Sequence, residues 1–218
     1  MRTIASWLFI TLDGVVEAPE TWVVYNEQMG EAIDQQARNA DTLLLGRKTY
    51  EVFAGSWPDR TVEDDPLADW MNTVDKVVVS ASLAETNWQN SRIVSGDLDD
   101  IIADLKSQPG NGVLVNGSPS LVTSLLQHGL LDELRLFVVP VLTNSGARLF
   151  ARGETPVSLE MIGSQTFDND VQLLTYRPKP GDQQSPQAAD AEQPAGYAAR
   201  GPVTRHGSGN ANPMIAGR

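Results

Sequence analysis

Short apolar runs alternate with amphipathic stretches along most of the chain, and this pattern predicts alternating strands and helices. The first run, residues 3–12, is almost unbroken, as expected for a central strand covered on both faces. Further strands are predicted at residues 41–45, 76–79, 91–94, 113–115 and 134–142, and helices at 26–40, 67–74 and 97–108 and from 119 to just before Gly129. Two last runs, 157–162 and 171–176, predict an antiparallel hairpin. The predicted fold is α/β, with a mainly parallel sheet and an antiparallel edge.

A strand, a glycine turn and a helix follow one another around Asn116 and Gly117. Ser118 is a favourable N-cap residue, and Pro119 suits the first helical position, which needs no N–H. Such a junction offers a phosphate unpaired backbone N–H groups and the positive end of a helix dipole. The same pattern also occurs in the ordinary strand-to-helix turns of any α/β protein. A phosphate site and an ordinary turn therefore both stay open as interpretations.

A second junction follows the strand at residues 41–45. Gly46 permits close approach of the backbone, Arg47 and Lys48 add two positive charges, and Thr49 brings a hydroxyl to a helix start. In an acidic chain this favours an anionic ligand over a merely solvated basic pair. Together the two junctions could hold a dinucleotide, although neither matches G-x-G-x-x-G or the Walker pattern.

Two further strand ends carry polar side chains. Asp13 leaves the first strand at the edge where open α/β sheets bind ligands, unless it only forms a turn with Gly14. Ser80 and Ser82 leave the strand at residues 76–79, where their hydroxyls either bind phosphate or cap the backbone that follows.

Charge and composition divide the chain in two. The formal net charge is −12, and residues 181–218 hold three acidic and three basic residues, so residues 1–180 carry all of it. This acidity disfavours nucleic acid as a partner. Residues 181–218 are rich in Gln, Ala, Gly and Pro and show no apolar periodicity, which predicts a disordered tail after a folded domain at 1–180.

The residue inventory excludes several kinds of chemistry. There is no cysteine, which fits a reducing, cytoplasmic location, and no apolar run approaches the ~20 residues of a membrane span. No convincing cleavage site for a signal peptide follows the first apolar run. With His128 and His206 as the only histidines, a zinc site or a Ser–His–Asp triad is disfavoured, and no metal is expected. The remaining groups suit a reaction whose hard chemistry is carried by a cofactor, such as hydride transfer from a nicotinamide.

The order and spacing of these motifs resemble the dihydrofolate reductase-like superfamily. The branch that it resembles most is the C-terminal reductase domain of bifunctional riboflavin-biosynthesis deaminase–reductases, with its stand-alone relatives. The resemblance covers residues 2 to about 178. It rests on Thr11-Leu12-Asp13-Gly14, Leu44-Leu45-Gly46-Arg47-Lys48-Thr49-Tyr50-Glu51, Met71-Asn72, Lys76-Val77-Val78-Val79-Ser80, Val115-Asn116-Gly117-Ser118 and Gly129-Leu130-Leu131-Asp132-Glu133-Leu134. It implies an eight-stranded sheet, NADPH as cofactor and a homodimer.

The resemblance also implies roles for particular residues. The cofactor phosphates would contact Gly46, Arg47, Lys48 and Thr49, the adenosine 2′-phosphate would lie near Ser80 and Ser82, and the pyrophosphate would lie on Asn116, Gly117, Ser118 and Leu121. A basic side chain beside a 2′-phosphate would favour NADP over NAD.

The substrate side is less specific. In the riboflavin branch the residue matching Asp13 lies at the substrate end, and dihydrofolate reductases hold the pteridine with a carboxylate of the first helix. That region offers Glu20 and Glu27 here, without the folate-enzyme pattern, and Asp13 and Glu27 are the catalytic candidates. No deaminase domain or set of its zinc ligands is present. The resemblance implies an NADPH-dependent reductase of a pyrimidine- or pterin-like small molecule, similar to 5-amino-6-(5-phosphoribosylamino)uracil reductase. The alternatives are a dihydrofolate reductase proper and a non-catalytic NADP-binding protein.

Overall fold

The computed structural model describes residues 1–150 and 155–179, so the tail predicted at residues 181–218 lies outside the described residues. A short 3-10 turn, Pro19–Thr21, precedes the first helix. The strands and helices, in chain order, are β1 Ile4–Thr11, α1 Glu27–Arg38, β2 Ala40–Gly46, α2 Arg47–Ala54, α3 Ala68–Thr73, β3 Asp75–Val79, β4 Ser91–Val94, α4 Leu98–Ser107, β5 Gly112–Asn116, α5 Pro119–Gln127, β6 Glu133–Val139, β7 Leu159–Thr166 and β8 Gln172–Pro178. None of these described helices combines the length and the apolar character needed to cross a membrane.

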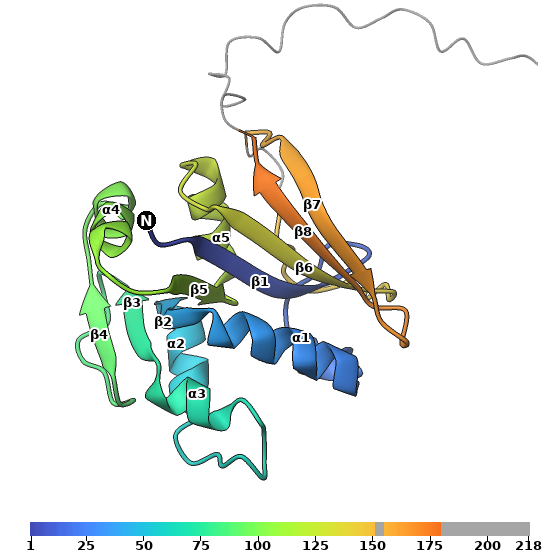
Figure 1. Cartoon of the computed structure of the whole chain (residues 1–218), viewed down its shortest axis with the longest axis horizontal. Helices are drawn as coiled ribbons and strands as arrows, with labels where there is room; N and C mark the ends of the chain where they lie inside the picture. Colours follow the sequence, from blue (N-terminus) through green and yellow to red (C-terminus); the bar gives the residue numbers. More distant parts are fainter. Residues whose placement is uncertain (151–154, 180–218) are drawn as a thin grey trace, which may run out of the picture. The chain divides into compact units, whose positions relative to one another are not determined.

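The strands form one eight-stranded sheet in the order β4-β3-β2-β5-β1-β6-β8-β7 (Figure 1). The first six in this order are parallel to one another, whereas β8 runs antiparallel to both β6 and β7. The predicted α/β fold, with a mainly parallel sheet and an antiparallel C-terminal hairpin, is therefore confirmed. β6 ends at Val139, before the predicted end at residue 142, and the residue that follows is Pro140, which has no N–H for a ladder.

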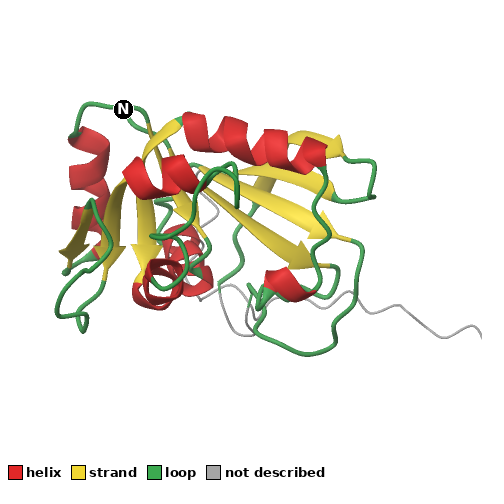
Figure 2. Ribbon diagram, turned by 90° about the horizontal axis from the view of Figure 1, so that it is seen from below, coloured by secondary structure: helices red, strands yellow, loops and turns green. Residues whose placement is uncertain are grey.

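Helices lie on both faces of the sheet (Figure 2). In β2, Leu44 joins the core cluster that contains α4 and α5, while Leu43 and Leu45 join the one that contains α2 and α3. On the same face as α2 and α3, α1 packs on the aromatic side chains of β1. Successive side chains of a strand point to opposite faces of the sheet. Because helices cover both faces here, nearly every residue of β1 and β2 is apolar.

Two crossovers run across the sheet in opposite directions. The chain leaves β1 and passes β5 to reach β2, and later it leaves β5 and passes β1 to reach β6. The connecting helices α1 and α5 accordingly lie on opposite faces. Such a reversal opens a crevice at the carboxyl ends of the strands, and ligands of open α/β sheets bind there. In this chain the crevice is expected between β5 and β1.

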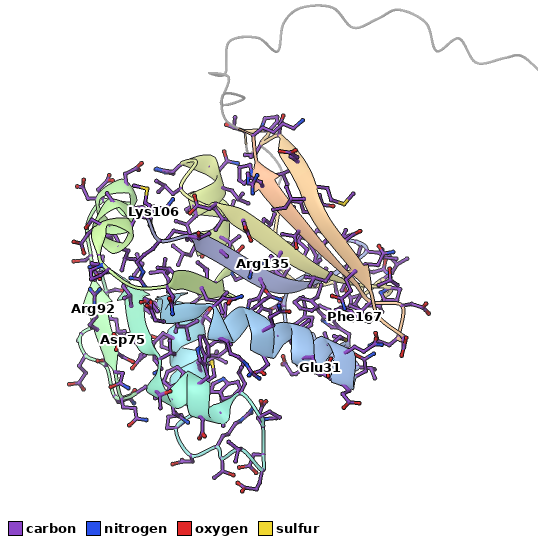
Figure 3. The ribbon with its side chains drawn as sticks, viewed as in Figure 1. Glu31, Asp75, Arg92, Lys106, Arg135 and Phe167 are labelled. Carbon is purple, nitrogen blue, oxygen red and sulfur yellow. The ribbon has the colours of Figure 1, made fainter. Side chains whose placement is uncertain are left out.

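The terminal hairpin is joined to the α1 face by aromatic packing. Phe167 lies just past β7 (Figure 3). Its ring stacks on that of Phe137 of β6, with ring centroids 6.1 Å apart. Phe137 in turn packs at a tilt on Phe9 of β1, with centroids 5.1 Å apart. These rings belong to the same core cluster as the buried side chains of α1.

Lys76 of β3 is wholly buried, which the strand pattern did not predict. Its ammonium group donates hydrogen bonds to the carbonyls of Val74 at 2.8 Å and Gln89 at 3.1 Å. It also lies 4.3 Å from the centre of the Trp88 ring, a cation–π distance. Burial lowers the pKa of Lys76 to about 8, and the nearby Asp75 carboxylate opposes this shift.

The buried lysine predicts an unusual pH dependence of stability. Above pH 8 the native protein loses the proton of Lys76, while the unfolded chain keeps it up to the ordinary lysine pKa of 10.5, so stability rises with pH. Relative to a Lys76→Met variant, the free energy of unfolding is expected to rise by about 1.5 kcal/mol over roughly 1.5 pH units above pH 8. Denaturant unfolding at several pH values measures this. Lys179→Met, at an exposed position, is the control, and parallel profiles for Lys76→Met and the unmodified protein would contradict the expectation.

Candidate active site

Two cavities open at the carboxyl edge of the sheet. The smaller one, of about 400 Å³, is here named the basic cavity, and its lining is Gly46, Arg47, Lys48, Thr49, Val79, Leu98, Ser118, Pro119, Ser120, Leu121 and Ser124. The larger one, of about 680 Å³, is the acidic cavity, and its lining is Trp7, Tyr25, Asn26, Glu27, Gly30, Glu31, Ile33, Asp34, Trp57, Asp64, Asp65, Pro66, Leu67 and Asn116. Asn116 lines one cavity and Ser118 the other, so the turn at Gly117 connects the two.

Helix starts supply the positive character of the basic cavity. Helices α2 and α5 both begin at residues that line it, Arg47 and Pro119. The N–H groups in the first turn of a helix have no partner within the helix, so each start carries a partial positive charge. Lys48 adds a full charge, and so does Arg47, which also pairs with Glu51 at 3.0 Å. This set of donors fits an anionic group such as a phosphate.

The two junctions, which were predicted to be able to hold a dinucleotide together, are hydrogen-bonded to each other. The N–H of Gly46 donates to the hydroxyl of Ser118 at 2.8 Å, and the N–H of Ser118 donates to the hydroxyl of Thr49 at 3.0 Å. Ser118 stands at the N-cap position of α5 with a φ of 57°, but its side chain makes no capping hydrogen bond. Ser118 is therefore the N-cap residue, as predicted, but its hydroxyl binds a residue of the other junction instead of the first turn of α5. These bonds hold the glycine turn against the start of α2.

The glycines at these junctions leave room for close backbone contact. Gly117 has a φ of +68°, and a Cβ atom there would lie 3.2 Å from the Cγ2 atom of Thr49. A Cβ atom at Gly46 would lie 3.4 Å from the Ser118 hydroxyl oxygen. Both backbone conformation and space therefore favour glycine at 117.

Replacing Gly117 by alanine is expected to lower the free energy of unfolding by about 1–2 kcal/mol, because an L-residue is strained at positive φ and its methyl group crowds Thr49. The matched control is Gly30→Ala. Gly30 lies inside α1 with open space around it, so alanine should stabilise the helix by about 0.5–1 kcal/mol. Urea unfolding of both variants measures the difference, and equal effects of the same sign would contradict this assignment.

The predicted cofactor residues gather at this edge with two exceptions. Gly46, Arg47, Lys48, Thr49, Ser118 and Leu121 line the basic cavity, and Asn116 and Gly117 form the turn beside it. Ser80 and Ser82 follow β3 but are not among the lining residues. The hydroxyl of Ser80 accepts hydrogen bonds from the N–H groups of Ser82 at 3.2 Å and Leu83 at 2.9 Å, which is the capping arrangement. Contact of any of these residues with a cofactor stays a prediction.

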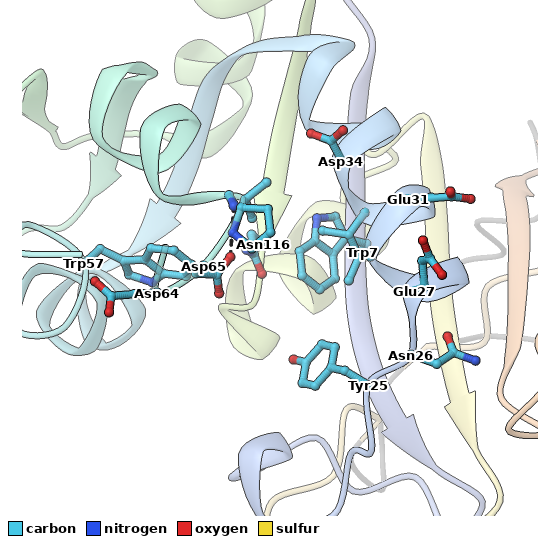
Figure 4. A pocket seen from close by; sticks show the side chains of 14 residues that line it. Trp7, Tyr25, Asn26, Glu27, Glu31, Asp34, Trp57, Asp64, Asp65 and Asn116 are labelled. Carbon is cyan, nitrogen blue, oxygen red and sulfur yellow. Dashed lines mark hydrogen bonds between the residues drawn. The ribbon is translucent and has the colours of Figure 1, made fainter. Parts of the chain in front are cut away.

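The acidic cavity lies between α1 and the loop at residues 55–67 (Figure 4). Trp7 and Asn116, neighbours across β1 and β5, lie between these two walls. The catalytic candidate Glu27 lines the cavity as the first residue of α1, where a negative charge also suits the helix dipole. The sequence interpretation missed Glu31 and Asp34, although their spacing of four and seven residues from Glu27 places all three on one helix face.

Asp13, the other catalytic candidate, does not line either cavity. Its carboxylate accepts hydrogen bonds from the hydroxyl of Thr11 at 2.7 Å and the N–H groups of Thr143 at 3.3 Å and Asn144 at 3.0 Å, and it pairs with Arg148 at 3.1 Å. The Thr11 hydrogen bond, helped by the two backbone N–H groups, lowers the pKa of the Asp13 carboxyl. This geometry anchors the loop after β6 to the end of β1, and a direct catalytic role stays a prediction.

Comparison with known proteins reveals related structures. A protein of Shewanella sp. PV-4 assigned to riboflavin biosynthesis superposes with a TM-score of 0.66 at 22% identity, covering 81% of this chain and 99% of that one. The diaminohydroxyphosphoribosylaminopyrimidine deaminase/5-amino-6-(5-phosphoribosylamino)uracil reductase of Thermotoga maritima gives a TM-score of 0.60 at 15% identity, covering 82% of this chain and 57% of that one.

Dihydrofolate reductase of Enterococcus faecalis, solved with NADP(H) and RAB-propyl, gives a TM-score of 0.55 at 15% identity, covering 81% of this chain and 96% of that one. These likenesses show the fold, which is dihydrofolate reductase-like. The model of the RibD C-terminal domain matches residues 2–173, nearly the whole described part of the chain. The chain therefore belongs to the RibD C-terminal domain family.

Proposed function

We propose that the protein is an NADPH-dependent reductase of a small pyrimidine- or pterin-like nitrogen heterocycle. The observation that carries this proposal is the pair of cavities of opposite character that meet at one glycine turn. The basic cavity suits a phosphate-bearing cofactor, and the acidic cavity suits the ring of a substrate. The family resemblance further favours a cytoplasmic homodimer.

The basic cavity fits the phosphate groups of a dinucleotide. Its helix starts, Lys48 and the close backbone approach at Gly46 and Gly117 are the features that a pyrophosphate needs. Arg47 would have to break its ion pair with Glu51 in order to bind a cofactor phosphate. Bound NADPH would supply a hydride. The protein then has to bind and orient the cofactor and the substrate, and to exclude water.

The acidic cavity would receive the substrate. Trp7, Ile33 and Trp57 offer apolar surface to a ring, and Asn116 offers amide hydrogen bonds at the side nearest Gly117. Glu27 is the carboxylate that we assign to substrate binding or proton transfer, because it lines this cavity. Asp13 would act from the adjoining loop, by orienting the substrate or relaying a proton.

Turnover tests the proposal directly. The full chain is mixed with NADPH and a panel of reducible pyrimidines and pterins, and oxidation of NADPH is followed by its absorbance. Oxidation that depends on one class of ring supports the reductase. Tight NADPH binding without oxidation across the panel would favour the non-catalytic NADP-binding protein, and oxidation with dihydrofolate alone would favour a dihydrofolate reductase.

Replacing Asp13 by asparagine separates its two roles. If Asp13 orients substrate or moves a proton, the variant should lose most turnover and keep nearly all of its NADPH affinity. Unfolding measured in parallel reports the loss of the anchoring bonds to Thr143, Asn144 and Arg148. Lower stability with full turnover would restrict Asp13 to anchoring.

A further inference from the structure

The wall of the acidic cavity that faces α1 is the irregular loop at residues 55–67. The cavity residues that it supplies are Trp57, Asp64, Asp65, Pro66 and Leu67. Within the described part of the chain, the hydrogen bonds of residues 56–66 join residues between 52 and 68, with one exception. In that exception the side-chain amide of Asn72 donates to the carbonyl of Trp57 at 3.0 Å. Apart from apolar packing, this is the bond that ties the middle of the loop to α3.

Asn72 lies in α3 and lines neither cavity, and the motif Met71-Asn72 entered the family resemblance without a role. Its side chain makes two hydrogen bonds that need opposite groups. The amide nitrogen donates to the Trp57 carbonyl, and the amide oxygen accepts from the indole N–H of Trp88 at 2.8 Å. An indole N–H only donates and a backbone carbonyl only accepts, so one orientation of the amide satisfies both. An ionised carboxylate, which only accepts, could serve Trp88 but not Trp57.

Buried groups fix the position of Asn72. Trp88 is 2% exposed, and its backbone N–H donates to the Tyr50 hydroxyl at 3.1 Å. The ring of Trp88 also lies over the ammonium group of Lys76. In addition, the side-chain amide of Gln89 donates to the backbone carbonyl of Asn72 at 2.9 Å. Asn72 is therefore fixed by the core, and its amide in turn fixes the loop.

The remaining contacts of Trp57 are apolar or lie within its own turn of the chain. Its ring packs edge-on against Phe53 with ring centroids 6.4 Å apart, and the Arg60 guanidinium lies 4.7 Å from the ring centre. The backbone N–H of Arg60 donates at 3.0 Å to the same carbonyl that Asn72 binds. The indole lies across the cavity from the labelled side chains of α1 (Figure 4). The bond from Asn72 therefore helps to set where this wall of the cavity stands.

We propose that Asn72 is a positioning residue for the acidic cavity, because its amide fixes the Trp57 carbonyl and so holds the indole against the substrate ring. This inference rests on the proposed function, since it concerns the substrate side of the same site. Asn72 touches neither substrate nor cofactor and acts only through Trp57. An indole contacts a ring about equally in the ground state and in the transition state. Its displacement therefore weakens substrate binding more than it slows the chemical step.

Fluorine NMR tests the contact itself. The full-length protein is labelled with fluorotryptophan, which gives one signal for each tryptophan, and Trp57→Phe identifies the Trp57 signal by its loss. Asn72→Asp keeps an acceptor for Trp88 and removes the donor to Trp57. The Trp57 signal is then expected to shift and broaden, because the indole takes up several positions. A Trp57 signal unchanged in frequency and width would overturn the proposal.

Two further variants assign the effect to the amide. Asn72→Ala adds no charge and should change the Trp57 signal in the same way, and it takes the place of Asn72→Asp if that variant does not fold. Gln89→Ala is the matched control, because it also removes one hydrogen bond to Asn72 but leaves the bond to Trp57 in place. Its Trp57 signal should match that of the unmodified protein. Equal changes in Gln89→Ala and Asn72→Asp would mean that any loosening of α3 moves the indole, and would contradict the role of the amide.

Kinetics separate this inference from the proposed function. With the pyrimidine or pterin of the panel that is reduced fastest, Asn72→Asp should raise KM about threefold to tenfold, which corresponds to one aromatic contact, and leave kcat nearly unchanged. An unchanged KM, or a fall in kcat alone, would overturn this inference and leave the proposed function standing. If the unmodified protein oxidises NADPH with no ring of the panel, the proposed reductase fails, whereas a moved Trp57 signal would still support Asn72 as the residue that positions the wall.

Discussion

Replacing Arg47 and Lys48 together by alanine is expected to weaken NADPH binding about a hundredfold. Hydrogen bonds to charged groups contribute about 1.5–3 kcal/mol each, and part of the Arg47 contribution is spent on breaking its pair with Glu51. The helix starts and the glycine turn remain, so residual binding is expected. Calorimetric titration at fixed salt concentration measures the loss.

The control for this pair is Arg177→Ala with Lys179→Ala. It also removes one arginine and one lysine, but Arg177 lies near the end of β8 and Lys179 directly follows β8, and both are outside the two cavities. NADPH affinity should then change little. Similar weakening by both pairs would mean that the long-range charge of the protein, rather than the basic cavity, governs binding.

Replacing Trp7 by alanine is expected to lower the free energy of unfolding by about 3–5 kcal/mol, the largest effect on stability among the cavity residues. The indole is 7% exposed and packs edge-on against Phe9 at 5.5 Å and Phe137 at 5.8 Å between ring centroids. Its removal leaves a hole where the acidic cavity meets the core. Denaturant unfolding measures the loss of stability.

Trp7→Phe is the informative companion variant. It keeps an aromatic ring in the cluster and removes an indole N–H that has no hydrogen-bond partner. The expected loss is below about 1.5 kcal/mol, because no hydrogen bond is broken and most of the packing volume stays. A loss as large as that of Trp7→Ala would show that the indole N–H has a partner in solution.

Local patterns predicted much of the fold because they act over short distances. The apolar runs of β1 and β5 and the amphipathic spacing of α1 were enough to locate those elements. Gly129 was predicted to end the helix that begins at residue 119. In the structure it follows α5 and has a φ of 67°. The hairpin was predicted by two runs flanking polar turn residues, and it is present as β7 and β8. The bounds of its first strand were wrong, because β7 spans Leu159–Thr166 and most of β8 pairs with residues beyond the predicted run 157–162.

What the sequence did not predict depends on contacts between distant residues. The Ser118 hydroxyl had an obvious local role as a cap, yet it binds the N–H of Gly46, 72 residues away. Arg2 is buried in a pair with Asp41 and donates to the Thr42 hydroxyl at 2.6 Å. No local pattern indicates such partners, because they are set by the order of strands in the sheet.

The candidate site also has one part that the sequence predicted and one part that it did not. The basic cavity was anticipated because its groups sit at two strand–helix junctions, and parallel strands bring their carboxyl ends to one edge. The acidic cavity was missed except for Glu27, because its second wall is an irregular loop positioned by packing. Asp13 was identified as a strand-end acid, but its partners Asn144 and Arg148 lie more than a hundred residues further along the chain.

The most direct test of the central claim is a calorimetric titration of the full chain with NADPH and, separately, with NADH at one fixed salt concentration. We expect tight binding of NADPH and clearly weaker binding of NADH, because a basic side chain, Arg47 or Lys48, beside the 2′-phosphate would favour the additional phosphate. Absence of binding by both dinucleotides would contradict the claim, and the two glycine junctions would then be ordinary turns of an α/β domain.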